Sequence, residues 1–284
     1  MIPYSSYLSV DWQASINWQS PFNKGLRAWF LNAPHVQGSL KWKPIFGDFD
    51  AALTNMETAD WIRVMGIPLD SGGWGSLLTD GANEHVTVTD HANLDITDEI
   101  TLICSMCPAS NVAFSSPIFK GSSAINYGMD CGSDGLKLRF FFTSGGNNHF
   151  YEVTNVFTIN VVRWYKIAVS FRFGTGSSIA VVVDGKQLTG SWTLGSGNAV
   201  PAANTDPLVF GRNGTSGAIY WNGLLDDIRI LNTYMSAPML SELQKDSDDY
   251  KRQALRRWIR VGKKSGAVFL PPGLLQSGTL IGAI

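Results

Sequence analysis

The sequence is poor in charged residues and in cysteine. Charged side chains make up 16% of the 284 residues and hydrophobic ones 44%, which argues against global disorder and leaves enough apolar material for a full core. The three cysteines are few and odd in number, which argues against a disulfide framework. Cys104 and Cys107 form a CxxC pattern, but residues three apart on a strand point to opposite faces. We therefore interpret them as packing residues rather than as a metal or redox pair.

Targeting and membrane-spanning segments are also missing. Residues 1–13 lack a basic n-region and an apolar h-region, so no secretory signal peptide is predicted. No uninterrupted apolar run of about 18 residues occurs. The nearest candidate, 267–284, is interrupted by Pro271, Pro272 and several glycines. We expect a protein that is made in a reducing cytoplasm and has no membrane partner.

Glycine, tryptophan and short alternating segments are abundant. The 29 glycines, 10 tryptophans and 12% aromatic residues suit many short strands joined by tight turns. The dipeptide Asp184-Gly185 is the strongest hairpin signal. The sequence therefore predicts an all-β fold, an antiparallel jelly-roll sandwich. Its strands are expected at residues 25–32, 84–89, 100–107, 135–143, 164–171, 179–183, 208–210 and 220–231.

The ends of the chain follow a different pattern from its middle. Residues 1–23 are polar and aromatic without periodicity, and we interpret them as an N-terminal arm before a sandwich at 24–235. Ser236 is a plausible N-cap, and the apolar spacing that follows predicts a C-terminal helical segment over 236–262. Residues 263–284 form an apolar tail with Gly and Pro, which we expect to pack on the protein's own surface or on a partner.

Basic residues are concentrated near the C-terminus. Seven of the 22 lie between 251 and 264, a stretch without acidic residues, so the rest of the chain has 15 basic and 23 acidic residues, a net charge near −8. A solvated helix face would explain the stretch as well as a dedicated binding segment would. Leu255, Trp258 and Ile259 lie among the basic residues at helical spacing, so we expect an amphipathic helix on an acidic protein surface rather than on nucleic acid.

Five sequence fragments, in order, carry a family resemblance. They are Asp80-Gly81, the strands at 101–108 and 164–170, the Val-Asp-Gly-Lys turn at 183–186, and Trp-Asn-Gly at 221–223 leading to 226–232. This order resembles the laminin-G-like jelly roll of the concanavalin A-like superfamily. A short helical turn usually follows the last strand of that family, and Ser236 to Gln244 fits it. The resemblance spans about 150 residues.

A second resemblance concerns the N-terminal part and the tail. Residues 25–34, 47–56 and 59–61 are similar to the leader of laminin-G-like proteins encoded by phages and prophages. This second resemblance implies a structural virion protein, either a capsid decoration or a tail-associated component. Such a protein would be located on the virion and would form a homo-oligomer. Its partners would be capsid or tail proteins, bound through Arg256, Arg257, Trp258, Arg260, Phe269, Leu270, Leu274 and Leu275.

Because the superfamily includes glycoside hydrolases, an enzyme must be considered. Retaining members carry paired carboxylates on one strand in an E-x-D-x-(x)-E run, and this sequence has none. Asp95, Asp98 and Glu99 come closest, but they lie in a predicted turn. GxSxG, HExxH and P-loop motifs are absent as well. We therefore predict that the protein is not an enzyme and keep a glycoside hydrolase as the third alternative.

The resemblance also implies a candidate structural calcium site. Laminin-G-like folds often hold Ca²⁺ with carboxylates and loop carbonyls, and the candidates here are Asp80, Asp226 and Asp227. Only one of two adjacent strand residues faces inward. The alternative is that Asp226 or Asp227 pairs with Arg229 or caps backbone amides. No other cofactor is expected.

Surface glycans are the candidate ligands of an alternative function, a carbohydrate-binding adhesion module. Sugars stack on exposed aromatic rings while Asn, Asp or Arg side chains hold their hydroxyl groups. Residues of these types lie in or near the late loops, and the candidates are Trp192, Arg212, Asn213, Tyr220 and Trp221. The competing interpretation is that aromatic residues of a sandwich belong to its core.

Overall fold

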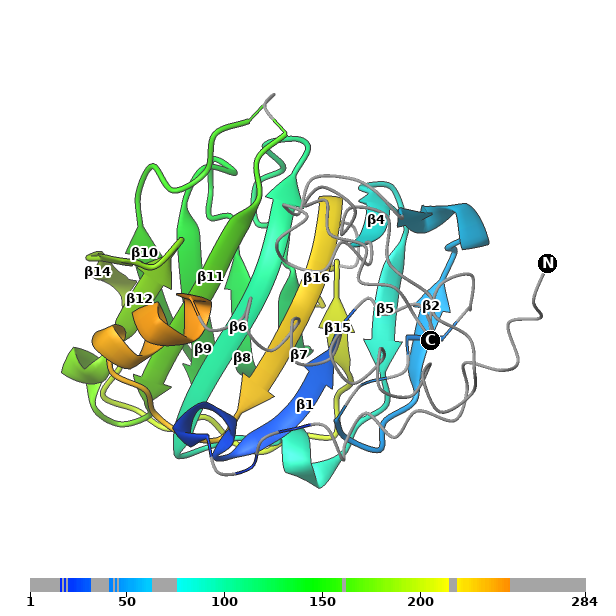
Figure 1. The fold of residues 1–284 in the computed structure, drawn as a ribbon. Coiled ribbons are helices and arrows are strands. Elements are labelled where there is room, and N and C mark those ends of the chain that lie inside the picture. Colours follow the sequence, from blue (N-terminus) through cyan, green and yellow to red (C-terminus); the bar gives the residue numbers. More distant parts are fainter. Residues whose placement is uncertain are drawn as a thin grey trace, which may run out of the picture.

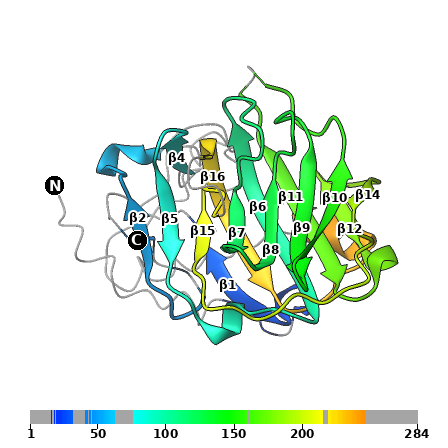
Figure 2. The ribbon, with the colours of Figure 1, turned by 180° about the vertical axis from the view of Figure 1, so that it is seen from behind.

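The fold is known from a computed structural model, which describes residues 16, 18, 20–31, 41, 42, 44, 46–62, 76–159, 162–214 and 219–245. Two antiparallel sheets of eight strands each pack face to face (Figures 1 and 2). The predicted all-β sandwich of jelly-roll type is confirmed. Among the described residues, no helix has the length and apolar character needed to cross a membrane.

The sheet that faces the viewer in Figure 1, here called the front sheet, is built around two ten-residue strands, β6 (Glu99–Pro108) and β16 (Asn222–Leu231). Both were expected from the sequence. The strand order is β13 (Lys186–Leu188), β12 (Ala180–Val183), β11 (Tyr165–Arg172), β6, β16, β4 (Ser76–Asp80) and β3 (Trp61–Ile62), with β1 (Leu26–Phe30) also paired to β16.

The sheet nearer the viewer in Figure 2, here called the back sheet, contains strands that the sequence did not reveal. β7 (IFKG) and β8 (INYGMD) are buried along their whole length but contain polar residues and glycine, so their sequences show neither an apolar run nor alternation. The order is β14 (Ser191–Leu194), β10 (Asn147–Val153), β9 (Leu138–Ser144), β8 (Ile125–Asp130), β7 (Ile118–Gly121), β15 (Leu208–Phe210), β5 (His85–Val88) and β2 (Ala51–Thr54).

The main hydrophobic core lies between the two sheets. Phe140 and Phe142 of β9 meet Phe171 of β11, with ring centroids 5.5 and 5.8 Å apart. All three side chains are almost fully buried. Cys104 belongs to the same core, and burial raises the pKa of its thiol well above the ordinary value. These contacts join the sheets into one body.

A second apolar layer covers the outer face of the front sheet. Residues 237–245 form a helix that lies across β11 and β12 (Figure 1). Leu240 and Leu243 of the helix pack in one cluster with Ala168 and Val182 of the sheet. The helix falls within the predicted segment 236–262, whose remaining residues lie outside the described part of the chain.

The predicted hairpin at Asp184-Gly185 is present. It joins β12 to β13 with Val183 opposite Lys186. Asp184 and Gly185 have φ of 52° and 75°, the left-handed pair that a type I′ turn requires. Asp184 also accepts a hydrogen bond from the Lys166 backbone N–H at 2.8 Å, which attaches the turn to β11.

Candidate functional site

Two loops meet at one end of the sandwich. Residues 80–85 connect β4 to β5, and residues 211–221 connect β15 to β16. Asp80 lies opposite Asn222 where β4 pairs with β16. A Cβ atom on Gly81, which has φ of +79°, would lie 2.8 Å from Asn222 Cβ, so the loops can approach this closely only with glycine at that position.

The carboxylates of the first loop hold its own backbone. Glu84 Oε2 accepts a hydrogen bond from the Asp80 N–H at 2.7 Å, and Asp80 Oδ1 accepts one from the Ala82 N–H at 2.7 Å. Burial raises the pKa of Glu84, and the nearby acids Asp60, Asp80 and Glu57 raise it further. The loop is therefore ordered by local side-chain to backbone bonds.

The second loop brings an aromatic ring beside two cationic or polar groups. Arg212 and Tyr220 face each other in an isolated antiparallel bridge, and the Arg212 Cζ lies 5.8 Å from the Tyr220 ring centroid. The His85 ring centroid lies 5.9 Å from the same ring. Arg212 and Tyr220 are half-buried. We name the group Arg212, Tyr220, His85 and Asn83 the loop-end cluster.

The hydrogen bond of His85 fixes its tautomer. Its Nδ1 lies 3.1 Å from the Asn83 carbonyl oxygen, and because a carbonyl only accepts, Nδ1 carries the proton. Burial lowers the pKa of His85, and the charge of Arg212 lowers it further, against the opposing effect of the Asn83 carbonyl. The neutral ring leaves Nε2 as a hydrogen-bond acceptor. His85 and Asn83 lay outside the predicted set because their position depends on a contact with a loop more than 120 residues away in sequence.

Four of the five predicted glycan-binding residues lie in the second loop, and three of them, Arg212, Asn213 and Tyr220, are considered first. Arg212 and Tyr220 form part of the loop-end cluster, while Asn213 is buried and donates from Nδ2 to the Phe114 carbonyl oxygen at 3.4 Å. Asn213 also donates its backbone N–H to the Ile219 carbonyl oxygen at 3.0 Å. It therefore holds the loop in place.

The two predicted tryptophans are packing residues instead. Trp221 is 1% exposed and belongs to the main core, so it is not accessible to a glycan. Trp192 is half-buried on β14, where its ring contacts Tyr151 and Phe171, and its Nε1 donates to the Gly176 carbonyl oxygen at 3.0 Å. The competing interpretation, that sandwich aromatics belong to the core, holds for both.

The three predicted calcium ligands do not form one site. Asp227 makes a two-pronged ion pair with Arg229, at 2.8 and 2.9 Å, and Asp227 Oδ1 accepts a hydrogen bond from Trp29 Nε1 at 2.8 Å. Asp80 pairs across from Asn222, four residues before Asp226 on β16, a separation of about 13 Å along an extended strand. These carboxylates do not fit a shared Ca²⁺. The alternative, pairing of Asp227 with Arg229, is what the structure contains.

A β-bulge explains the local geometry. The register of β16 against β6 shifts between Asp226 and Arg229, and Asp227 has a positive φ of 49°. A bulge re-aims side chains away from simple alternation, and here the Asp227 carboxylate is directed at Arg229 and Trp29. Because both partners are almost fully buried, removing one would leave an unpaired charge, at a cost of about 3–5 kcal/mol.

Other acidic residues are engaged in structural pairs. Glu99 binds Arg172 at 2.8 Å and accepts the Tyr234 N–H at 2.9 Å, while Asp95 lies 3.0 Å from Lys120 Nζ. Within the described part of the chain, no group of three or more His, Cys, Asp or Glu residues is placed to hold a metal ion. The predicted partner-binding residues, between 256 and 275, lie outside the described residues.

Solved structures with the same fold have low sequence identity to the chain. A Trypanosoma rangeli sialidase in complex with 2,3-difluorosialic acid matches with a TM-score of 0.53 and 13% identity, over 80% of this chain and 34% of the sialidase. The chain thus spans about a third of that protein's length. Domain 4 of a GH43 extracellular arabinanase from Geobacillus stearothermophilus, in complex with arabinotriose, matches with a TM-score of 0.51 and 15% identity, over 77% of this chain and 98% of that domain.

A third solved structure is the binding domain of botulinum neurotoxin DC in complex with SialylT. It matches with a TM-score of 0.54 and 10% identity, over 79% of this chain and 52% of that one. At these identities the likeness concerns the fold alone. No curated protein matches the sequence. The profile of the concanavalin A-like lectin/glucanases superfamily matches residues 80–241, more than half of the chain, and the protein therefore belongs to that superfamily.

Proposed function

We propose that the protein is a non-catalytic carbohydrate-binding module and that the loop-end cluster is its binding site. The observation that carries the proposal is the placement of the half-buried Tyr220 ring beside Arg212 and His85. A half-buried aromatic ring offers a face for the apolar side of a sugar. The guanidinium donates hydrogen bonds, as the hydroxyl groups of a sugar require, and the buried His85 packs beside the Tyr220 ring.

The carboxylates at this end favour binding over hydrolysis. Glycosidic cleavage uses two carboxyl groups that flank the scissile bond. Asp80 and Glu84 are instead bonded to backbone N–H groups of their own loop. Several structural neighbours were solved with sugars or sugar analogues, among them sialic acid and arabinotriose, which supports a saccharide as the ligand class.

Glycan binding by the full chain tests the proposal. We expect a saccharide ligand to be found on a glycan array, and we expect Tyr220→Ala to weaken its affinity at least about tenfold, or about 1.4 kcal/mol. Isothermal titration calorimetry would measure both affinities. Tyr234→Ala is the matched control, since Tyr234 is another half-buried tyrosine, one that lies against Arg172 away from the cluster. Equal losses in both variants, or no glycan binding by the full chain, would contradict the proposal.

We further infer that the module is a component of a phage particle, attached through its C-terminal residues. The support is the resemblance of residues 25–61 to phage-encoded leaders and the sequence after Lys245, which combines seven basic residues with an apolar end. Basic-to-acidic steering and burial of apolar surface would attach such a segment to a capsid or tail protein. The sandwich would then display the loop-end cluster to surface glycans.

A truncation after Lys245 tests this attachment. The cut must spare the helix 237–245, because Leu240 and Leu243 pack on the front sheet. We expect the full chain to assemble or to bind particles and the shortened chain to remain a monomer, as measured by light scattering and co-sedimentation. Identical behaviour of the two chains would leave glycan binding as the sole function.

A further inference from the structure

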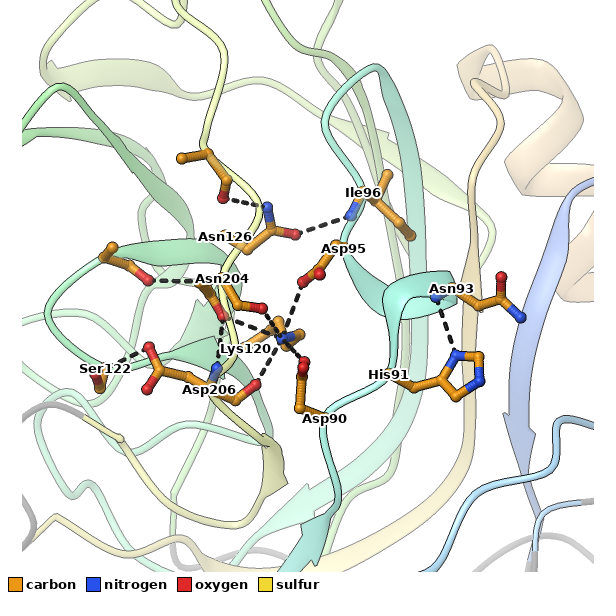
Figure 3. Close-up of polar contacts among 12 residues, drawn as sticks. Asp90, His91, Asn93, Asp95, Ile96, Lys120, Ser122, Asn126, Asn204 and Asp206 are labelled. Carbon is orange, nitrogen blue, oxygen red and sulfur yellow. Dashed lines mark hydrogen bonds and ion pairs between the residues drawn. The ribbon is translucent and has the colours of Figure 1, made fainter.

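A lysine ammonium is enclosed in oxygen atoms between the sheets. Lys120 lies on β7 and its side chain is fully buried. Five oxygens surround its Nζ, from the loop before β6 and the loop before β15 (Figure 3). They are Asp90 Oδ1 at 2.7 Å, Asp95 Oδ1 at 3.0 Å, Asn204 Oδ1 at 3.0 Å, the Asn204 carbonyl at 3.4 Å and the Asp206 carbonyl at 2.6 Å. We call this set the oxygen cage.

Bonds that do not involve Lys120 also hold the cage. Asn204 Nδ2 donates to the Ala124 carbonyl at 2.9 Å, and Asn204 Oδ1 accepts the Asp206 N–H at 3.1 Å. Ser122 Oγ donates to Asp206 Oδ2 at 2.9 Å. These contacts are drawn in Figure 3. The oxygens of residues 204–206 are therefore oriented by their neighbours, so the cage does not depend on the lysine alone.

The lysine leaves the cage incompletely satisfied. An ammonium has three N–H donors, and five oxygens face it. Asp95 Oδ1 is buried and receives no hydrogen bond although it lies 3.0 Å from Nζ. The hydroxyl of Tyr127, the residue opposite Lys120 on β8, is also buried without a hydrogen bond. Burial raises the pKa of Tyr127 and the charges of Asp95 and Asp90 raise it further, which places the hydroxyl in their field.

The chemistry of the cage is that of a hard-cation site. Carboxylate, amide and backbone carbonyl oxygens are the ligands that Ca²⁺ takes, at about 2.3–2.6 Å. The two carboxylates of the cage carry two negative charges, and the Lys120 ammonium neutralises only one of them. A divalent cation would neutralise both. The observed distances of 2.6–3.4 Å would have to shorten by several tenths of an ångström around a metal ion.

We propose that Lys120 Nζ occupies the position of a divalent cation, and that the oxygen cage binds Ca²⁺ when the lysine side chain is shortened. In the natural chain the ammonium is an internal cation that fastens residues 90–95 and 204–206 to the back sheet. The natural fold consequently needs no calcium at this position. The inference is independent of the loop-end cluster and of glycan binding.

Two variants of the full chain separate the proposal from simple loss of a side chain. Lys120→Ala vacates the cage, whereas Lys120→Met removes the charge but still fills the space. We expect calcium to raise the melting temperature of Lys120→Ala by about 5–10 °C at a free concentration about 100 times Kd. Lys120→Met and the natural protein should show no shift with calcium or with a chelator. Mg²⁺ should act more weakly, because it requires a tighter octahedral shell.

Terbium luminescence gives a second readout. Tb³⁺ in the vacated cage would be sensitised by the nearby Tyr127, and excess Ca²⁺ would quench the signal by displacement. Adding Asp95→Asn to Lys120→Ala should abolish both the luminescence and the calcium response. If Lys120→Ala unfolds in chelator, calcium added during refolding should restore the folded state. An absent response, failure to refold with calcium, or an equal response in Lys120→Met would overturn the proposal.

Discussion

At the scale of single residues, His149 shows how burial and one hydrogen bond fix a protonation state. Its ring stacks on Phe142, with centroids 4.6 Å apart and planes 5° apart. Its Nδ1 accepts the Gly197 backbone N–H at 3.1 Å. A nitrogen that accepts a hydrogen bond carries no proton, so this contact requires the neutral ring. Burial accordingly lowers the pKa of His149 below its ordinary value of 6.5.

The lowered pKa predicts a loss of stability in acid. Well above pH 6.5, His149 is neutral in both the folded and the unfolded chain, and its contact with residue 197 is fully present. As the pH falls from 6.5 towards the folded-state pKa, the unfolded chain binds more protons, so the free energy of unfolding decreases. Urea unfolding measured across this range should show the decrease.

His149→Gln is the control for this pH dependence. A glutamine carbonyl can accept the same N–H but does not titrate. We expect the natural protein to lose more stability than His149→Gln as the pH falls. His85, whose pKa is also lowered, titrates in both chains and cancels in the comparison. Parallel pH profiles of the two chains would show that the Nδ1 contact has no part in acid sensitivity.

Residue roles were predictable from the sequence only where the chemistry is local. The alternative that Asp227 pairs with Arg229 needed only two neighbouring residues. Lys120 gave no such signal, because its cage comes from loops as many as 86 residues away. Trp221 and Tyr220 are adjacent in sequence, but one is in the core and the other is half-exposed. Such a difference is set by strand pairing and cannot be read from residue type.

At the scale of elements, the helix 237–245 is attached to the front sheet by a buried amide. Gln244 Nε2 donates to the Lys166 and Val182 carbonyl oxygens at 2.9 and 3.2 Å. Its Oε1 accepts the Gly185 N–H. The side chain thus bonds two strands and the turn between β12 and β13 while remaining buried.

Removing this amide should weaken the docking of the helix. Gln244→Ala would remove three hydrogen bonds that a buried amide makes to the backbone of two strands and the turn between them, and we expect it to destabilise the protein by about 1–3 kcal/mol. Urea unfolding followed by circular dichroism would measure the change. Lys245→Ala is the control, because the adjacent Lys245 is exposed and such changes alter stability by about 0.5 kcal/mol or less. A similar small change in Gln244→Ala would contradict the docking role.

The central strands and the main hairpin were predicted from the sequence, and several strands of the back sheet were missed. The central strands β6, β11 and β16 and the Asp184-Gly185 turn carry strand and hairpin signals in the sequence itself. By contrast, β8 (INYGMD) carries polar residues and a glycine although all six positions are buried, so its sequence shows neither an apolar run nor a polar face that alternates with an apolar one. β2 and β3 lie in a region rich in Gly, Pro and Asp, where local composition favours loops. They are ordered by pairing with β5 and β4.

At the scale of the whole molecule, the shared core makes the two sheets one cooperative unit. The Phe142 ring, on the back sheet, has its centroid 5.8 Å from that of Phe171 on strand β11 of the front sheet. It also lies 5.0 Å from the ring centroid of Phe173, the residue directly after β11. The main cluster contains buried residues from both sheets. Neither sheet can keep its inner face covered when the other unfolds, because each one provides the apolar surface that the other needs.

This interdependence predicts how Phe142→Ala unfolds. The substitution empties a fully buried position and should cost about 3–5 kcal/mol. Because the cavity lies between the sheets, far-ultraviolet circular dichroism and tryptophan fluorescence should both shift to the same lower urea midpoint and remain coincident. Leu194→Ala on the exposed edge strand β14 should leave both transitions unchanged, since Leu194 is 47% exposed. Separate transitions in Phe142→Ala would mean that one sheet remains folded after the other has unfolded. That result would contradict the claim that the shared core makes the two sheets one cooperative unit.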